Sequence, residues 1–441
     1  MGSPNPGVFA SHPQVPTDMI PFLMMLPLLV PAGAKRGRPS KARKERVLRP
    51  VPPPTKESGS APPARVSSRR RSPPAQVLGQ RALNRALLQR QWLLQRFRTG
   101  VVEALEHLVG LQAQATHPPY GGLWTRLEGF QQEALTRLIT ERQVVRAGMM
   151  RGTLHLVTAR DCLALRPVLQ PALDRALKHS SHGKQLAGVD VQALVARGRA
   201  LLEARPSPRG ELGQRLQEQW PGHDASALSM GFSSLEPLVV VPPCGTWGHG
   251  ERMVYATAES WLGQRFEPAA PPDALVPRYL AAFGPASVRD LQAWSGLSRM
   301  GAVLERLRPG LRTFRDEHGV ELFDTPDARR PDPDTPAPVR FLSEFDSALL
   351  AHADRTRILS DAARKRVFTR NGIVRATLLV DGFVQGTWRI ERARGTATLC
   401  ITPFARLSRE DRAALSDEGA RLLAFAAADA RRVDLRFERV E

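Results

Sequence analysis

Cysteine is scarce in this chain of 441 residues. The three cysteines, Cys162, Cys244 and Cys400, lie far apart and are odd in number. Their spacing supports neither a disulfide framework nor a zinc site, and it favours a reducing, cytoplasmic compartment. The chain also lacks a Gly-x-x-x-x-Gly-Lys loop, a His-Glu-x-x-His pair and a Cys-x-x-Cys pair. Nucleotide hydrolysis and zinc chemistry are therefore disfavoured, and we expect no metal and no cofactor.

Long hydrophobic runs are also missing. The longest apolar run, Met19–Ala34, has 16 residues and contains Pro21, Pro27 and Pro31. It is short for a membrane span, and three prolines would break a helix. Positive charge follows the run instead of preceding it, which is the wrong order for a secretory signal. We therefore expect no membrane partner and interpret the run as part of a disordered or mis-started N-terminal extension.

Positive charge is abundant but unevenly distributed. The net charge is +20 and the pI about 11.1, which favours a polyanionic partner. Residues 1–80 hold 4 Lys and 9 Arg against 3 acidic residues, so about half of the excess lies there. The remainder of the chain is more mildly basic.

The N-terminal extension, residues 1–77, is rich in Pro, Arg, Ser and Gly, which predicts disorder. Within it, Lys35-Arg36-Gly37-Arg38-Pro39 resembles the core of an AT-hook. Arg36 and Arg38 are therefore candidates for a narrow minor groove, where negative potential attracts arginine. The alternative is a solvated basic linker.

From residue 78 to residue 325, one plan of two helices and a β-hairpin occurs three times, without a strict sequence repeat. The predicted units are residues 78–190 with a helical spacer, 191–265 and 266–325. In the first unit, an apolar helix is predicted to end in Leu111–Gln114. A hairpin over Val144–Val157 turns at Arg151-Gly152, and Thr158 with Asp161 predicts the start of the spacer helix, which runs to about Lys184.

The second and third units repeat this plan. In the second, Gly210–Trp220 and Ala225–Leu235 are predicted helices, and Leu238–Val241 and Met253–Ala256 predicted strands. The third reads as a helix-turn-helix with a wing; its predicted parts are a helix over Ser287–Trp294, a turn over Ser295–Leu297, a helix over Ser298–Leu307 and a hairpin over Leu311–Phe323.

A proline-rich linker, residues 326–339, precedes a C-terminal domain over residues 340–441. Ala376–Trp388 reads as two strands joined by the turn Asp381-Gly382. Further strands are expected over Thr396–Phe404 and Val433–Phe437, with a helix over Glu410–Ala427. The sequence thus predicts an α+β fold: three tandem winged-helix units followed by a small, mostly β, barrel-like domain.

Four groups of residues resemble a known family, the bacterial winged-helix DNA glycosylases. They are Leu111–Gln114, Arg151–Val157, Val241–Gly248 and the Asp381-Gly382 turn with Gly386-Thr387-Trp388. The resemblance covers roughly residues 80–441 and implies three winged helices and a C-terminal β-barrel. Members of the family unhook interstrand crosslinks and remove N7-alkylated purines. Their catalytic pattern, Gln-aliphatic-Gln or Asp, is matched by Gln112, Ala113 and Gln114, although Ala113 is smaller than the usual middle residue.

The Gln pair suits a substrate that is already activated. An N7-alkylated purine is cationic, so its glycosidic bond is weakened before the protein acts. Two amide oxygens can then orient a water and face the positive charge that develops on the sugar. A carboxylate would be a stronger base, so a Gln pair predicts modest acceleration limited to activated lesions. The alternative for Gln112 and Gln114 is helix capping or a solvated surface.

Other residues are weaker candidates. Arg151 at the hairpin tip, His155 on its second strand and Arg299 at the start of the third unit's second helix are proposed DNA contacts; plain turn, packed and surface roles are the alternatives. Trp247 could stack on a base or pack its own loop. Glu344 and Asp346 suggest a carboxylate pair or ordinary surface patterning. Asp354, Arg355 and Arg357 suggest a structural ion pair.

The sequence therefore predicts a monomeric, monofunctional DNA glycosylase that acts on damaged double-stranded DNA in the cytoplasm, in association with the nucleoid. Most affinity should come from phosphate contacts. The alternative is a non-catalytic winged-helix DNA-binding protein or transcriptional regulator. An architectural role rests only on the AT-hook-like segment and the basic tail.

Overall fold

The computed structural model describes residues 76–249 and 252–440. The predictions for the N-terminal extension, including Arg36, Arg38 and the apolar run Met19–Ala34, lie outside these residues. The described chain begins just before a short strand, so residue 77 belongs to the folded part. No helix within residues 76–249 or 252–440 is long and apolar enough to cross a membrane.

The fold is mixed α and β. The helices are α2 (Gln80–Arg90), α3 (Val101–His107), α4 (His117–Trp124), α5 (Gln132–Thr140), α6 (Ala159–His179), α7 (Ser181–Gln185), α8 (Val191–Ala204), α9 (Arg209–Gln217), α10 (Ala225–Leu235), α11 (Ala258–Leu262), α12 (Leu275–Phe283), α13 (Val288–Ser295), α14 (Met300–Leu307), α15 (Ser347–Leu350), α16 (Asp361–Val367) and α17 (Arg409–Ala426). The strands are β1 (Val77–Leu78), β2 (Leu111–Gln112), β3 (Val144–Gly148), β4 (Leu154–Thr158), β5 (Ser207–Pro208), β6 (Leu238–Val240), β7 (Val254–Thr257), β8 (Arg312–Asp316), β9 (Glu321–Asp324), β10 (Arg340–Leu342), β11 (Thr377–Val380), β12 (Phe383–Ala393), β13 (Thr396–Pro403) and β14 (Arg432–Phe437).

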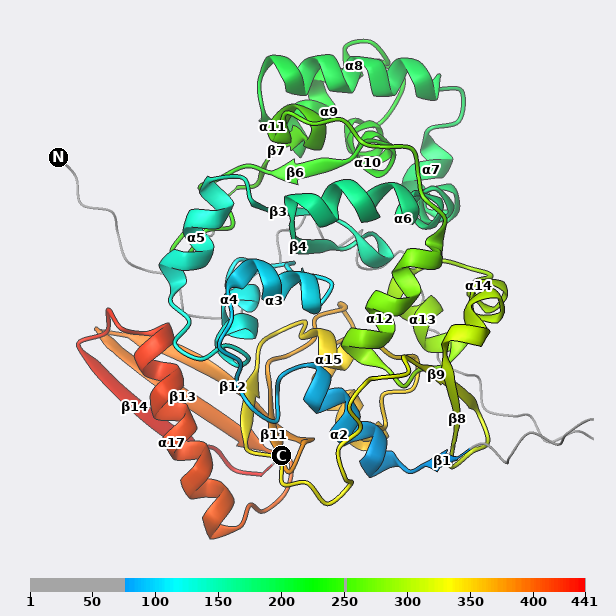
Figure 1. The fold of residues 1–441 in the computed structure, drawn as a ribbon. Helices are drawn as coiled ribbons and strands as arrows, with labels where there is room; N and C mark the ends of the chain where they lie inside the picture. Colours follow the sequence, from blue (N-terminus) through cyan, green and yellow to red (C-terminus); the bar gives the residue numbers. More distant parts are fainter. Residues whose placement is uncertain (1–75, 250–251, 441) are drawn as a thin grey trace, which may run out of the picture. The chain divides into compact units, whose positions relative to one another are not determined.

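The first two predicted hairpins share one sheet. Its strand order is β2-β4-β3-β6-β7-β5, and the two hairpins are joined where β3 pairs with β6. The hairpins themselves form as predicted, with β3 antiparallel to β4 and β6 antiparallel to β7 (Figure 1). The Arg146–Val240 and Ala147–Val239 pairs make this join. The wings of the first two units are therefore halves of one continuous sheet.

The predicted helix-turn-helix of the third unit is confirmed. The side chain of Ser287 accepts a hydrogen bond from the backbone N–H of Asp290, whose carboxylate accepts one from the N–H of Ser287. This reciprocal capping fixes the start of α13. Gly296 ends the helix with a φ of 81°, a left-handed conformation that favours glycine. The hairpin β8–β9 follows, with β1 parallel to β8 at its edge.

The predicted C-terminal barrel is wrong. The strands form an open five-stranded sheet in the order β10-β11-β12-β13-β14, with edges at β10 and β14. The last two strands are parallel, and the connection between them contains α17, which lies against the sheet (Figure 1). Leu422 and Leu423 of this helix share a core with Leu399 and Ile401 of β13. Because α17 covers the apolar face, the sheet is buried without closing on itself.

The hydrophobic cores extend across the predicted domain boundaries. The largest core runs from Leu87 of α2 to Val384 of β12 and includes side chains of the first and third units. A second core joins α3, α4 and α5 to the C-terminal sheet. A third core, around Leu194, Leu212 and Phe232 of the second unit, also includes Leu177 and Leu186 of the first unit's helical spacer. Packing thus fixes the first unit between the third unit and the C-terminal sheet.

Candidate active site and nucleic-acid interface

The Gln pair begins on a strand and not at the end of a helix, contrary to the sequence prediction: Gln112 ends β2, and Gln114 lies in the bend that follows. Helix α3 ends at His107, and the chain turns at Val109 and Gly110, whose φ values are 54° and 85°. A Cβ on Gly110 would lie 2.6 Å from the Val157 side chain, so this turn requires glycine. The turn brings Leu111 and Gln112 beside β4, where Gln112 pairs with His155. The backbone of Leu111 and Gln112 therefore forms hydrogen bonds with β4 and does not continue helix α3.

Gln112 is buried and held by the hairpin tip. Its side chain is 6% exposed, and its Oε1 accepts a hydrogen bond of 2.8 Å from Nη2 of Arg151. The other terminal nitrogen of Arg151 donates to the backbone oxygen of Trp294 at the end of α13, at 2.7 Å. Arg151 adopts a left-handed φ of 58° at this turn. The hairpin tip therefore links the Gln112 amide to the helix-turn-helix.

Arg151 is a half-buried cation. Burial, together with the nearby Arg355, lowers its pKa to about 10. The guanidinium stays protonated at neutral pH, since this value is well above 7. Its two terminal nitrogens donate to Gln112 and to the Trp294 carbonyl. These two hydrogen bonds do not test the predicted contact between Arg151 and DNA, which stays a prediction.

Gln114 has a fixed orientation. It is 1% exposed, and its Oε1 accepts a hydrogen bond of 2.7 Å from the backbone N–H of Leu154. Because an N–H can only donate, the oxygen of the amide must face Leu154. The amide nitrogen Nε2 then lies on the other side, buried and without a hydrogen-bond partner among the described residues.

The backbone around the pair is held by a buried arginine that sequence reasoning missed. Arg146 on β3 donates from Nε to the Ala113 oxygen at 2.6 Å and from Nη2 to the Gln114 oxygen at 3.0 Å. The N–H of Ala113 donates to the Leu154 oxygen. In the sequence, Arg146 alternates with Val145 and Ala147, as any polar residue of a half-buried strand does. This pattern therefore gave no sign that Arg146 holds the backbone of the Gln pair.

His155 is packed beneath this strand pair. It is 2% exposed, and its Nδ1 lies 2.9 Å from the backbone oxygen of Thr153. Burial and the neighbouring Arg151 lower its pKa to about 3, so the imidazole is neutral at physiological pH. A positively charged contact with phosphate is therefore disfavoured for this side chain, although its role in DNA binding is untested.

Arg299 is exposed at the first turn of α14, with a φ of 60°. Other arginines in and just after this helix are ion-paired. Arg306 contacts Asp273 at 2.8 Å, and Arg308 contacts Glu305 at 2.7 Å. Such pairing reduces the positive charge that α14 presents to a DNA groove. Arg299 remains the predicted phosphate contact of this helix.

The carboxylates Glu344 and Asp346 have different environments. Asp346 forms a buried, bidentate ion pair with Arg126, with N–O distances of 2.8 and 2.9 Å, and caps α15. Glu344 is largely buried, and burial raises its pKa to about 7. Among the described residues, its carboxylate has no hydrogen bond or ion pair. The two therefore do not form a matched pair.

The predicted ion pair around Asp354 is arranged differently. The Asp354 carboxylate accepts a hydrogen bond from the backbone N–H of Thr356. Arg357 instead lies 3.9 Å from Asp290 and donates to the Pro285 oxygen. Arg355 stacks on Phe368 and donates to the Leu349 oxygen. These side chains serve the packing of α13 and α15.

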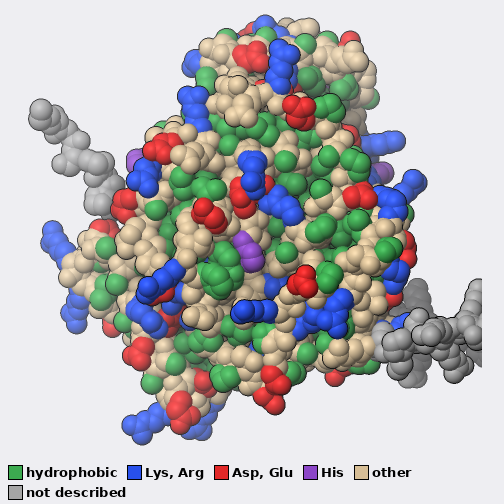
Figure 2. Space-filling model, in the orientation of Figure 1, with side chains coloured by type: hydrophobic (Ala, Val, Ile, Leu, Met, Phe, Trp, Pro, Cys, Tyr) green, Lys and Arg blue, Asp and Glu red, His purple; other side chains and the backbone are tan. Residues whose placement is uncertain are grey.

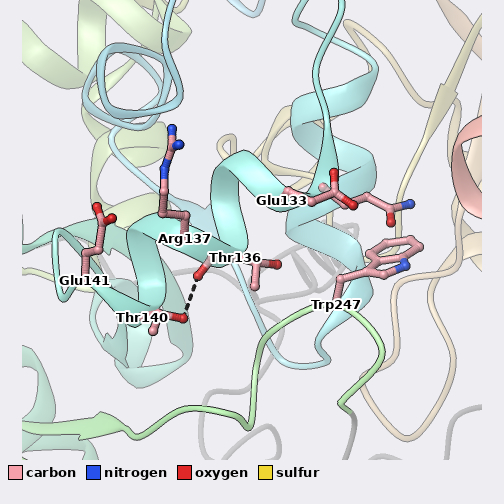
Figure 3. A pocket seen from close by; sticks show the side chains of 7 residues that line it. Glu133, Thr136, Arg137, Thr140, Glu141 and Trp247 are labelled. Atoms are coloured by element: carbon pink, nitrogen blue, oxygen red, sulfur yellow. Dashed lines mark hydrogen bonds between the residues drawn. The ribbon is translucent and has the colours of Figure 1, made fainter.

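A surface pocket of about 390 Å³ lies along α5 and beside Trp247 (Figure 3). Its charged residues have both signs: Glu133 and Glu141 flank Arg137. Trp247 is half-buried and packs against Tyr120 and Phe425 at centroid distances of 5.1 and 5.6 Å. Trp247 thus packs its loop, and the pocket includes neither Gln112 nor Gln114.

Glu391, Cys400 and Glu438 place their ligand atoms within 4.8 Å of one another. Arg389 contacts both carboxylates at 2.7 Å, and Arg436 lies 3.3 Å from Glu391. The arginines supply the positive charge that a cation would bring. On the face seen in Figure 2, Lys and Arg side chains lie among Asp and Glu side chains, without one large basic patch.

Comparison with known proteins identifies the family. The sequence profile of the family described as "DNA glycosylase AlkZ-like" matches residues 105–425. The chain belongs to the AlkZ-like DNA glycosylase family. A curated relative, the interstrand DNA cross-link repair glycosylase of Streptomyces sahachiroi, is 24% identical over 358 residues, which cover 76% of this chain and 92% of the relative.

A solved structure of a family member has the same fold. The Streptomyces sahachiroi DNA glycosylase AlkZ superposes with a TM-score of 0.63 at 21% identity, covering 82% of this chain and 100% of the other. The AlkZ-like match begins at residue 105 and so includes the Gln112–Gln114 segment, both shared-sheet hairpins and most of the C-terminal sheet. The resemblance inferred from sequence is thereby confirmed.

Proposed function

We propose that this AlkZ-like chain is a monofunctional DNA glycosylase that hydrolyses the N-glycosidic bond of N7-alkylated purines and unhooks interstrand crosslinks formed through such bases. The observation that carries the proposal is the Gln112–Ala113–Gln114 segment, whose two amides are oriented by Arg151 and by the Leu154 N–H. The curated relative's name, a cross-link repair glycosylase, supports the second activity.

The arrangement suits water activation by amide oxygens. Each carbonyl oxygen has two lone pairs, and each accepts one hydrogen bond from the protein. One lone pair per amide remains for a water or for the electron-poor sugar. Because the protein donors hold both amides still, little reorganisation is needed as charge develops.

The reaction then balances without a strong acid. The C1′–N9 bond breaks, and its electron pair moves onto the cationic purine, which leaves as a neutral base. The water oxygen bonds to C1′ and releases its proton to solvent, leaving an abasic site. An unmodified purine would leave as an anion and would need protonation, which no amide provides. The Gln pair therefore selects for activated lesions.

We further propose that the enzyme acts as a monomer on damaged double-stranded DNA in the cytoplasm, near the nucleoid. Arg151, His155, Arg299, Arg36 and Arg38 remain the proposed DNA contacts. A bulky crosslink does not fit a closed base-flipping pocket, so we expect the lesion to stay within the duplex.

Incubation of the full chain with a duplex carrying one N7-methylguanine, followed by cleavage of abasic sites, tests the proposal. We expect a shortened strand, and release of the two strands from a crosslinked duplex. An undamaged duplex of the same sequence is the control. Absence of release from both lesions, together with a footprint at a specific undamaged sequence, would instead establish the winged-helix regulator.

A further inference from the structure

A second cavity, of about 40 Å³, is lined in part by the hairpin β3–β4 and opens partly to solvent. Its walls come from the hairpin β3–β4, from α6, α9 and α10, and from β6 and β7, which gather in the teal and green part of Figure 1. The side chains that matter here are Gln114, Arg166, Arg209, Ser233 and Tyr255. The volume suits about two or three waters, or a group of similar size.

The cavity is rich in donors and contains no carboxylate among its lining residues. Gln114 contributes the buried amide nitrogen that has no partner. Arg209 has no hydrogen bond to any described residue; its guanidinium lies 4.8 Å from the Tyr255 ring centroid, and its Nε is buried. Arg166, 2% exposed, donates only to the neutral acceptors Gln170 and Ser234.

The cavity thus brings together two buried nitrogens without an acceptor, Nε of Arg209 and Nε2 of Gln114, and leaving such donors unpaired is costly. The cationic alkylated base of the proposed reaction would be repelled by Arg166 and Arg209. An oxyanion, by contrast, would accept from all three side chains. Arg209 is also the first residue of α9, whose cap residue Pro208 offers no side-chain acceptor. The positive end of that helix favours an anion.

We propose that this cavity binds a phosphodiester group of the DNA substrate, held by Arg209, Arg166 and Nε2 of Gln114. The proposal rests on the proposed glycosylase function. It gives the Gln114 amide two roles: its oxygen faces the reacting water, and its nitrogen contacts a backbone phosphate. The DNA strand that carries this phosphate is thereby fixed in register with the Gln pair, because both roles belong to the same amide.

The first test uses lesion-bearing duplexes in which single phosphates are replaced by uncharged methylphosphonates. For the wild-type chain, we expect one position near the lesion where replacement raises Kd about tenfold. In Arg209→Gln, Kd for the unmodified duplex should rise by a similar factor, and replacement at that position should have no further effect. The salt slope of binding should fall by about one unit.

Arg432→Gln is the matched control, because Arg432 is an exposed arginine on β14, away from the cavity. It removes the same charge but should leave the position-specific effect intact. If both variants lose affinity equally at every methylphosphonate position, the charge acts only at long range, and the proposal is wrong. Circular dichroism and thermal melting confirm that each variant folds.

Inorganic phosphate distinguishes the two sources of the anion. At equal ionic strength, phosphate should raise the melting temperature of the wild-type chain more than chloride does. This difference between the two anions should be smaller in Arg209→Gln. If phosphate stabilises the wild type but no methylphosphonate position depends on Arg209, the cavity takes a free anion and not DNA. If the position effect is present without base release, the site stands and the proposed glycosylase function fails.

Discussion

At the scale of single residues, Arg151 determines the orientation of one amide of the Gln pair. Its position at a hairpin tip suggested a DNA contact, but its terminal nitrogens donate to Gln112 and to the Trp294 carbonyl. Sequence could place Arg151 on the turn, since the hairpin pattern is local. It could not show where the side chain points, because Trp294 lies 143 residues away.

Replacement of Arg151 by Met should lower the single-turnover rate of base release about 100-fold at saturating enzyme, because Gln112 loses its orienting donor; loss of its proposed DNA contact should in addition raise Kd for the duplex. Rapid-quench assays at saturating enzyme measure the rate. Arg299→Met is the comparison: it should weaken binding and lower the salt slope by about one unit without changing that rate. A purely weaker binding in Arg151→Met would contradict a positioning role.

Glu344 should make stability depend on pH. Burial raises its pKa from the ordinary 4.5 to about 7. Between these values the folded chain keeps the proton and the unfolded chain loses it, so stability falls as pH rises. From pH 5 to pH 8 the wild type should lose about 2–3 kcal/mol relative to Glu344→Gln in urea unfolding. The exposed control Glu267→Gln should follow the wild type at every pH.

At the scale of elements, the ion pair between Arg126 and Asp346 joins the loop after α4 to the start of α15. Both side chains are at most 1% exposed. Asp346→Asn would leave a buried guanidinium without its counter-charge, and we expect a loss of about 3–5 kcal/mol in chemical denaturation. Glu128→Gln breaks the exposed Arg98–Glu128 pair and should cost much less, because water screens both charges. Equal losses would show that burial is not the deciding factor.

Local sequence signals predicted many of the helices and strands. Several of the remaining features depend on pairing between distant segments and were not predicted. Thr158, Ser287 and the Asp381-Gly382 turn mark boundaries that the structure confirms. The helices α8 and α12 were missed, and Leu111–Gln114 was predicted to be helical because the apolar helix before it has the same character. The β3–β6 join and the open C-terminal sheet depend on contacts between distant segments, which no local pattern records.

At the scale of the whole molecule, the candidate site depends on three parts of the chain. The strand β2 and the bend after it supply the Gln pair, the first hairpin orients it, and the helix-turn-helix anchors that hairpin through Trp294. The motif residues could be predicted because they lie within four consecutive positions. The surrounding donors, Arg146, Arg166 and Arg209, come from different elements and could be recognised only in the folded chain.

Removal of residues 1–75 tests the role of the basic extension, which carries about half of the net charge. We expect the slope of log K against log salt to become shallower by about 3–5 units, because fewer phosphates are neutralised. The single-turnover rate at saturating enzyme should not change, since the Gln pair lies outside the extension. Fluorescence anisotropy at several salt concentrations measures the slope, and an unchanged slope would exclude a DNA-binding role for Arg36 and Arg38.

The most direct test of the account compares base release and DNA affinity in the variant Gln112→Ala/Gln114→Ala. Gln192→Ala, an exposed glutamine on α8, is the control. With a duplex that carries one N7-methylguanine, we predict at least about a 100-fold loss of the single-turnover rate in the double variant, with Kd within about tenfold of the wild type. Weakened binding with an unchanged rate at saturation would show that the pair binds DNA and performs no chemistry.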